Sequence, residues 1–166
     1  MKKSLVTLAL AGLSILIVES ASAQSSAAQN VTLTVNTVYK ISTSGNPSSM
    51  TVTTGTAGTD ALSSVSDNST TYSITQNFGN TVKVAANLDA ALAAGYTLQI
   101  NMASTKGTST GTMDISNATS GSAVDVVTGV NRGADAGQMI TYTFSALASA
   151  GMLSSTNKTV TFTLTN

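Results

Sequence analysis

The sequence predicts an all-β domain, an antiparallel β-sandwich of roughly nine short strands. Over most of the chain, apolar residues alternate with Thr, Ser and Asn at a period of two, which is the pattern of a strand buried on one face. Turn residues interrupt this alternation about every 8 to 12 residues, as in sandwich folds. No helical segments regularly separate the strands, which argues against a parallel α/β fold. An up-and-down barrel is the alternative, but the uneven loops at 55–69 and 116–122 disfavour it.

The first 23 residues carry the features of a cleaved export signal. Lys2 and Lys3 precede an apolar run that ends at Val18, and the small residues 21–23 form a cleavage site of the A-x-A kind. This run is too short to span a bilayer, which needs about 20 residues. We therefore expect three parts, listed here: a Sec-type signal peptide over 1–23, a flexible leader over 24–30 and the β-sandwich domain over 31–166. The product is expected in the periplasm, at the cell surface or outside the cell, with no membrane span after cleavage.

The first half of the domain is expected to supply four strands. In chain order they are a strand over 31–41 with a bulge or bend, a short strand over 50–54, a strand around Tyr72 and Ile74, and a strand around Val82 and Val84. Turn residues occupy 44–48, and the polar stretch 55–69 is expected to be a surface loop. The four residues 77–80 predict a hairpin between the third strand and the fourth.

The second half contains the most regular alternation. Strands are expected over 96–102, 113–115, 124–127, 140–144 and 160–164, with a hairpin loop over 131–137. The segment 87–95 is the one stretch with helical character, with one or two turns stopped by Gly95. Pattern alone leaves the Ala-rich segments 85–94 and 146–150 open between short helices and strands of small residues. The number of short strands and the spacing of the turns predict a sandwich of the immunoglobulin-like or pilin-like kind.

Missing residue types exclude several classes of function. The chain has no His, Cys or Trp, so it lacks an imidazole base, a thiolate nucleophile, a Cys/His zinc site and a disulfide framework. The G-x-S-x-G motif at 107–111 resembles a nucleophile elbow but has no histidine partner. We expect a protein that is not an enzyme and has no cofactor. The few cations are scattered along the chain, so we expect no nucleic-acid partner.

Two weak site candidates remain. Oxygen ligands for Ca²⁺ could come from Asp125, Asn131 and Asp135, although Asn and Asp in a hairpin loop are the preferred interpretation. Phe78 stands at a turn tip, where it is either a surface contact or a packing residue beneath the turn. The other aromatic residues fall on the strand pattern and are expected to pack in the core.

The two ends of the domain carry the main functional hypothesis. Each end is an alternating strand, whose exposed edge can pair with another chain. The assembly residues are expected to be Val31, Leu33 and Val35 on a donor or edge strand, and Val160, Phe162 and Leu164 on the acceptor side.

The export signal, the Thr-rich alternation and the closing run TVTFTLTN at 159–166 resemble the spore coat protein U and fimbrial-subunit group of secreted bacterial proteins. This resemblance implies a non-enzymatic structural or adhesive cell-surface protein that assembles through edge strands. Its partners would be further copies of itself, or other surface proteins or glycans. The alternative is a monomeric secreted binding module for carbohydrate or Ca²⁺ that uses loop 131–137 or loop 55–69.

Overall fold

The computed structural model describes residues 25–166, so the expected signal peptide at 1–23 lies outside the described residues. The chain divides into two units, Met1–Thr34 and Val35–Asn166, and every described strand belongs to the second. Residues 25–38 form no regular secondary structure, so the strand expected from Val31 begins only at Tyr39. Among the described residues, no helix has the length and apolar character needed to cross a membrane.

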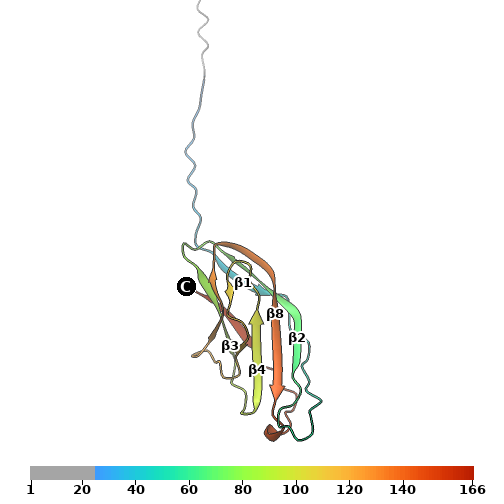
Figure 1. Cartoon of the computed structure of the whole chain (residues 1–166). Helices are drawn as coiled ribbons and strands as arrows, with labels where there is room; N and C mark the ends of the chain where they lie inside the picture. The colour runs from blue at the N-terminus through green and yellow to red at the C-terminus, as the bar shows by residue number, and fades with distance from the viewer. Residues whose placement is uncertain (1–24) are drawn as a thin grey trace, which may run out of the picture. The chain divides into compact units, whose positions relative to one another are not determined.

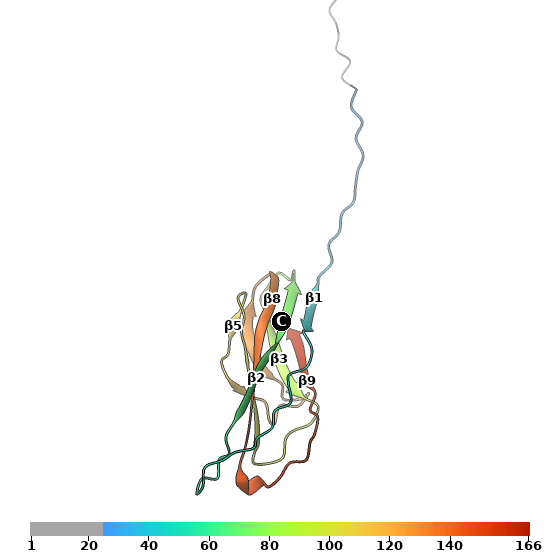
Figure 2. The ribbon, with the colours of Figure 1, turned by 90° about the vertical axis from the view of Figure 1, so that its right-hand side faces the viewer.

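The second unit is an antiparallel β-sandwich, as the alternation predicts (Figures 1 and 2). One sheet has the strand order β1-β2-β8-β4-β6 and the other the order β5-β7-β3-β9. The described strands are β1 (Tyr39–Thr43), β2 (Val65–Gln76), β3 (Val82–Leu88), β4 (Tyr96–Met102), β5 (Thr108–Ser109), β6 (Met113–Asp114), β7 (Val124–Val130), β8 (Gly133–Ala146) and β9 (Val160–Thr165), with a short 3₁₀ turn η1 (Ala148–Ala150) before β9. All pairs between these strands are antiparallel.

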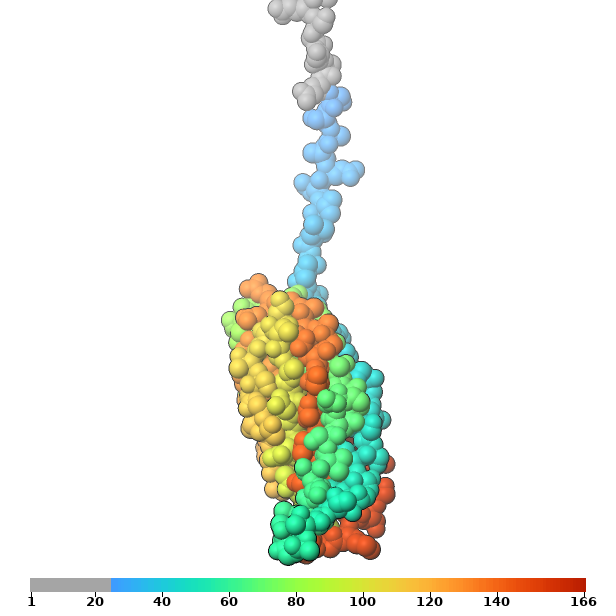
Figure 3. Space-filling view, turned by 45° about the vertical axis from the view of Figure 1, so that its right-hand side comes forward, coloured from blue at the N-terminus to red at the C-terminus, as the bar shows by residue number. Residues whose placement is uncertain are grey.

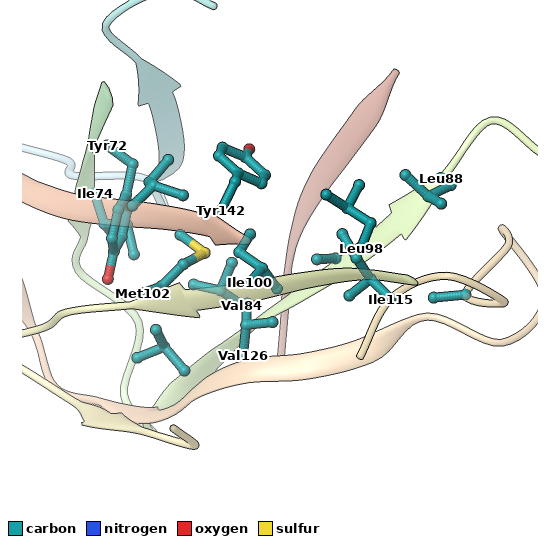
Figure 4. Packing of buried hydrophobic residues seen from close by; sticks show 14 of the residues in the cluster. Tyr72, Ile74, Val84, Leu88, Leu98, Ile100, Met102, Ile115, Val126 and Tyr142 are labelled. Carbon is teal, nitrogen blue, oxygen red and sulfur yellow. The ribbon is translucent and has the colours of Figure 1, made fainter. Parts of the chain in front are cut away.

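The core fills the space between the two sheets (Figure 4). In β4 the apolar residues at alternate positions are buried and the polar residues between them are half-exposed, as the sequence pattern requires. Ile100 of this strand and Val84 of β3 are fully buried from opposite sheets. The strands expected over 96–102 and 160–164 are therefore confirmed.

Two expected hairpins are wrong, because both connections cross between the sheets. Strand β2 pairs with β1 and β8, whereas β3 pairs with β7 and β9, so residues 77–81 form a sandwich corner. The step from β7 to β8 also changes sheet, which places Asp135 within β8 and not in a loop. A short connection can join two antiparallel neighbours in one sheet or two strands in opposite sheets. The sequence pattern does not distinguish these two cases.

Three further local expectations are also wrong. The segment 87–95 forms no helix, because Leu88 ends β3 in register with Val160 and the rest is turn. A helix this short has little stability without tertiary packing. No strand forms over 50–54, where the one ladder contact is an isolated bridge from Gly55 to Leu62. The loop expected over 55–69 ends early, since β2 already begins at Val65 opposite Phe144.

The buried alternation of β4 generates the first prediction. Ile100→Ala is expected to lower the free energy of unfolding by about 2–5 kcal/mol, because it removes a fully buried side chain and leaves a cavity between the sheets. Urea unfolding followed by far-UV circular dichroism measures this loss. Thr97→Ala, on the half-exposed face of the same strand, is the control and should cost less than about 1 kcal/mol. Equal losses in the two variants would contradict the assignment of faces.

Candidate functional site

The candidate site is a cleft between two edge strands of the sandwich. Strand β1 is the edge of the five-stranded sheet and β9 is the edge of the four-stranded sheet, and the two lie side by side (Figure 2). The cleft has a volume of about 190 Å³. Its lining consists of Ile41, Ser42, Thr43, Val160 and Phe162.

The cleft is incompletely covered apolar surface. Val160, Phe162 and Leu164 alternate along β9 and pack on the core, yet each is only partly buried, and Ile41 of β1 is in the same state. Val84, on the neighbouring strand β3, is fully buried. Within the described part of the chain, β9 pairs only with β3, so its outer edge presents unpaired backbone groups. The β9 edge thus offers unpaired backbone groups beside partly covered apolar side chains.

The segment 25–35, which extends the expected leader 24–30 and is called the leader from here on, has a matching pattern. Val31, Leu33 and Val35 alternate with threonines, belong to no strand, and are 74%, 85% and 84% exposed. These three residues are the ones that the sequence marks for a donor strand. Large apolar side chains exposed to this degree in one short segment are typical of an interaction site.

Reasoning from sequence found one wall of the cleft and missed the other. It named Val160, Phe162 and Leu164, which the structure places along β9 beside the cleft. It did not name Ile41, Ser42 or Thr43, which line the opposite wall. The change in the phase of the alternation before Ile41 could have drawn attention to these three residues. It does not, however, reveal which strand faces β1.

The Asn77 side chain fixes the chain just before β1. Its Nδ2 donates to the carbonyl oxygen of Asn36 at 2.9 Å, and its Oδ1 accepts from the Val38 backbone N–H at 2.6 Å. The Asn77 backbone N–H also donates to the Val38 carbonyl oxygen at 3.2 Å. Phe78 follows in the same turn and packs against Tyr39, with ring centroids 5.4 Å apart. Phe78 is therefore partly buried as a packing residue, with the remainder of its surface available for contact.

The Ca²⁺ candidates are occupied by other partners. Asp135 is only 1% exposed, and its carboxylate accepts from the hydroxyls of Ser104 (2.6 Å) and Thr105 (2.7 Å) and from the Lys106 backbone N–H (3.2 Å). Asp125 instead pairs with Lys83 at 2.8 Å.

The third candidate, Asn131, donates from its side chain to the Lys106 carbonyl oxygen. Across the described residues there is no group of three or more acidic, His or Cys side chains placed to hold a metal. Each of the three candidates therefore already has a structural partner.

The hydrogen bonds to Asp135 also set its ionisation. Burial disfavours the charged carboxylate, but the donors from Ser104, Thr105 and the Lys106 backbone outweigh this effect and hold the pKa of Asp135 below its ordinary value of 3.8. The ionised side chain therefore holds the 104–106 turn against β8. Its role in the described structure is to stabilise the fold.

Comparison with known proteins adds no residues to the site. The sequence matches no protein-family profile, and no curated protein or solved structure matches it significantly.

The Asp135 geometry generates the second prediction. Asp135→Asn is expected to lower the free energy of unfolding at neutral pH by about 1–3 kcal/mol, because the amide cannot accept all of these hydrogen bonds. A carboxylate with a lowered folded-state pKa stabilises the protein fully above its unfolded-state pKa and loses this effect as the pH falls through the folded-state pKa. The difference from the parent should therefore shrink at acidic pH below about 4. Urea unfolding at a series of pH values measures it.

Asp125→Asn is the matched control, since its ion pair with Lys83 lies at the surface and contributes about 0–1 kcal/mol. Millimolar Ca²⁺ should leave the melting temperature of the parent and of both variants unchanged. A rise in the melting temperature of the parent alone would contradict the assignment of Asp135 as a purely structural residue.

Proposed function

We propose that the protein is a non-enzymatic, exported structural subunit of the cell exterior, in which the leader of one copy fills the β1/β9 cleft of the next. The observation that carries this proposal is the match between an exposed alternating leader and the unpaired β9 edge, which lies beside partly buried apolar residues. Strand addition at a sheet edge provides affinity through backbone hydrogen bonds and specificity through alternate side chains. The export pattern and the resemblance to coat and fimbrial subunits support the same function.

The two segments have complementary registers. With the leader antiparallel to β9, Leu33 stands opposite Phe162, and Val31 and Val35 stand opposite Leu164 and Val160. The antiparallel direction is favoured because every described strand pair of the sandwich is antiparallel. Complete burial of one such side chain contributes about 1.5–3 kcal/mol, so three of them can outweigh part of the cost of ordering the leader.

The occupant of the cleft is the leader of another copy rather than the chain's own. To enter its own cleft, the leader would have to turn back at Asn36–Val38, directly before β1. Asn77 holds this segment through three hydrogen bonds, which a turn would disrupt. A donor at one surface and an acceptor at another form a heterologous contact, which repeats without closing and gives a fibre.

The leader alternation generates the third prediction. The double variant Leu33→Asp and Val35→Asp, in the chain that follows the expected cleavage site, should abolish assembly, because two charges would enter the apolar cleft. Light scattering after size exclusion should show a ladder or fibres for the parent and a monomer for the variant. The melting temperature of the variant monomer should equal that of the parent domain, since both side chains are exposed.

The matched control is Thr32→Asp with Thr34→Asp, which adds the same charge on the other face of the leader. This variant should still assemble, although more weakly at low salt. Assembly of the Leu33/Val35 variant at the parent level would refute the donor role, and a parent that stays a sharp monomer at every concentration would refute the proposed function.

A further inference from the structure

We propose that the lower end of each copy is a docking surface for the upper end of the next copy in the fibre. The upper end is where β1 begins and β2 ends, and the lower end is where β8 runs into η1 (Figure 1). This inference rests on the proposed function and goes beyond it, because it assigns an interface outside the strand-addition cleft. The occupant is a second copy of this chain.

The lower end presents exposed apolar side chains. Leu147, Met152 and Leu153, on either side of η1, are 40%, 99% and 45% exposed. The segment 146–153 protrudes at the lower end beside the 55–62 loop (Figure 3).

The scaffold beneath these side chains is well anchored. The Asp60 carboxylate accepts from the backbone N–H and the hydroxyl of Ser149, both at 2.8 Å, and the Asp60 carbonyl accepts from the Ala148 N–H at 2.7 Å. The Tyr96 hydroxyl donates to the Ala150 carbonyl at 3.1 Å. The turn is thus held in a defined position, so the exposed side chains on either side of it start from a fixed scaffold.

The upper end also presents exposed apolar and aromatic side chains. Val38 and Tyr39 are 37% and 38% exposed, and Phe78 packs on Tyr39 and is only partly buried. These residues lie beside the segment that Asn77 fixes. A methionine such as Met152 makes favourable contacts with aromatic rings and adapts to their shape.

The length of the leader brings the two ends together. In the antiparallel register, Val35 of the donor leaves the cleft beside Val160, the first residue of β9, to which the connection 151–159 leads from the lower end. The extended chain from Val35 to Tyr39 spans at most about 14 Å. The upper end of the donor must therefore lie against the lower part of the acceptor, where the connection 151–159 joins η1 to β9.

Charge at the two ends is complementary. The upper end carries the exposed cations Lys40, Lys106 and Arg132 and one buried, ionised carboxylate, Asp135. The lower end carries the exposed carboxylates of Asp60 and Asp89 and one cation, Lys158, which donates to a backbone carbonyl and keeps its charge. Opposite potentials steer association and select a head-to-tail arrangement over a head-to-head one.

Cysteine cross-linking tests this interface directly, because the chain has no cysteine of its own. The double variant Phe78→Cys with Met152→Cys, oxidised after assembly, should give a disulfide-linked ladder on a non-reducing gel. Each single variant should give no ladder, because one cysteine per chain can link two copies at most. A head-to-tail contact also does not bring two copies of one residue together. Phe78→Cys with Thr108→Cys is the control, because Thr108 lies on the edge strand farthest from β9 in its sheet.

The outcomes separate this inference from the proposed function. Parent assembly without a ladder from the double variant would overturn the end-to-end contact and leave strand addition intact. A ladder that survives Leu33→Asp with Val35→Asp would support the contact and refute the donor role of the leader. Absence of both assembly and ladder would overturn both proposals.

A second readout needs no cross-link. Met152→Ser should weaken assembly by about 10-fold, the upper range for a lost methionine–aromatic contact. It should leave unchanged the binding of a synthetic peptide of residues 25–37 to the Leu33/Val35 variant, because this peptide ends before Val38 and contains none of the upper-end residues. A parallel loss of peptide binding in the Met152→Ser background would place Met152 in the cleft and contradict the inference.

Discussion

The structure depends on one constraint: the edge strands β1 and β9 lie side by side without pairing, and the apolar surface between them is only partly covered. Along β9 the apolar side chains face the core but remain partly covered, and the outer backbone edge pairs with nothing in the described residues. A sheet edge of this kind is a liability unless something covers it. The leader has the alternation that a covering strand needs, and the hydrogen bonds of Asn77 disfavour its return to the same molecule. The unpaired β9 edge, the alternating leader and the hydrogen bonds of Asn77 together support the proposed pairing between copies.

The residues that stabilise the fold and those of the proposed assembly belong to different parts of the molecule. Strands β3 and β4 bury their apolar side chains. Three polar side chains fix the connections around the core: Asp135 holds the 104–106 turn, Asn77 the approach to β1 and Asp60 the η1 turn. None of these needs the leader, whose side chains are exposed. A domain of this kind can fold first and assemble afterwards. The surface left over is rich in Ser and Thr and poor in charge.

Much of the fold could be predicted from the alternation, because a strand that is buried on one face has apolar residues at every second position. Strands β4 and β9 follow from Tyr96–Met102 and Val160–Thr165 in this way. The pairing of strands could not be read, because residues 77–80 look the same in a hairpin and in a sandwich corner. For the same reason Asp135 looked like a loop residue. The donor residues and the β9 wall were accessible from sequence, whereas Ile41 entered the site only through the position of β1 opposite β9.

Amide hydrogen exchange on the parent chain, measured at low and at high protein concentration, tests the central claim most directly. Strand addition between copies predicts that the amides of residues 31–35 and those on the outer edge of β9 become protected together as the concentration rises, while the β4 amides stay protected throughout. Leader amides that exchange freely at every concentration would contradict the account, because the β9 edge would then have no strand added to it. Leader protection that persists at the lowest concentration would contradict it in a different way, since the chain would be filling its own cleft.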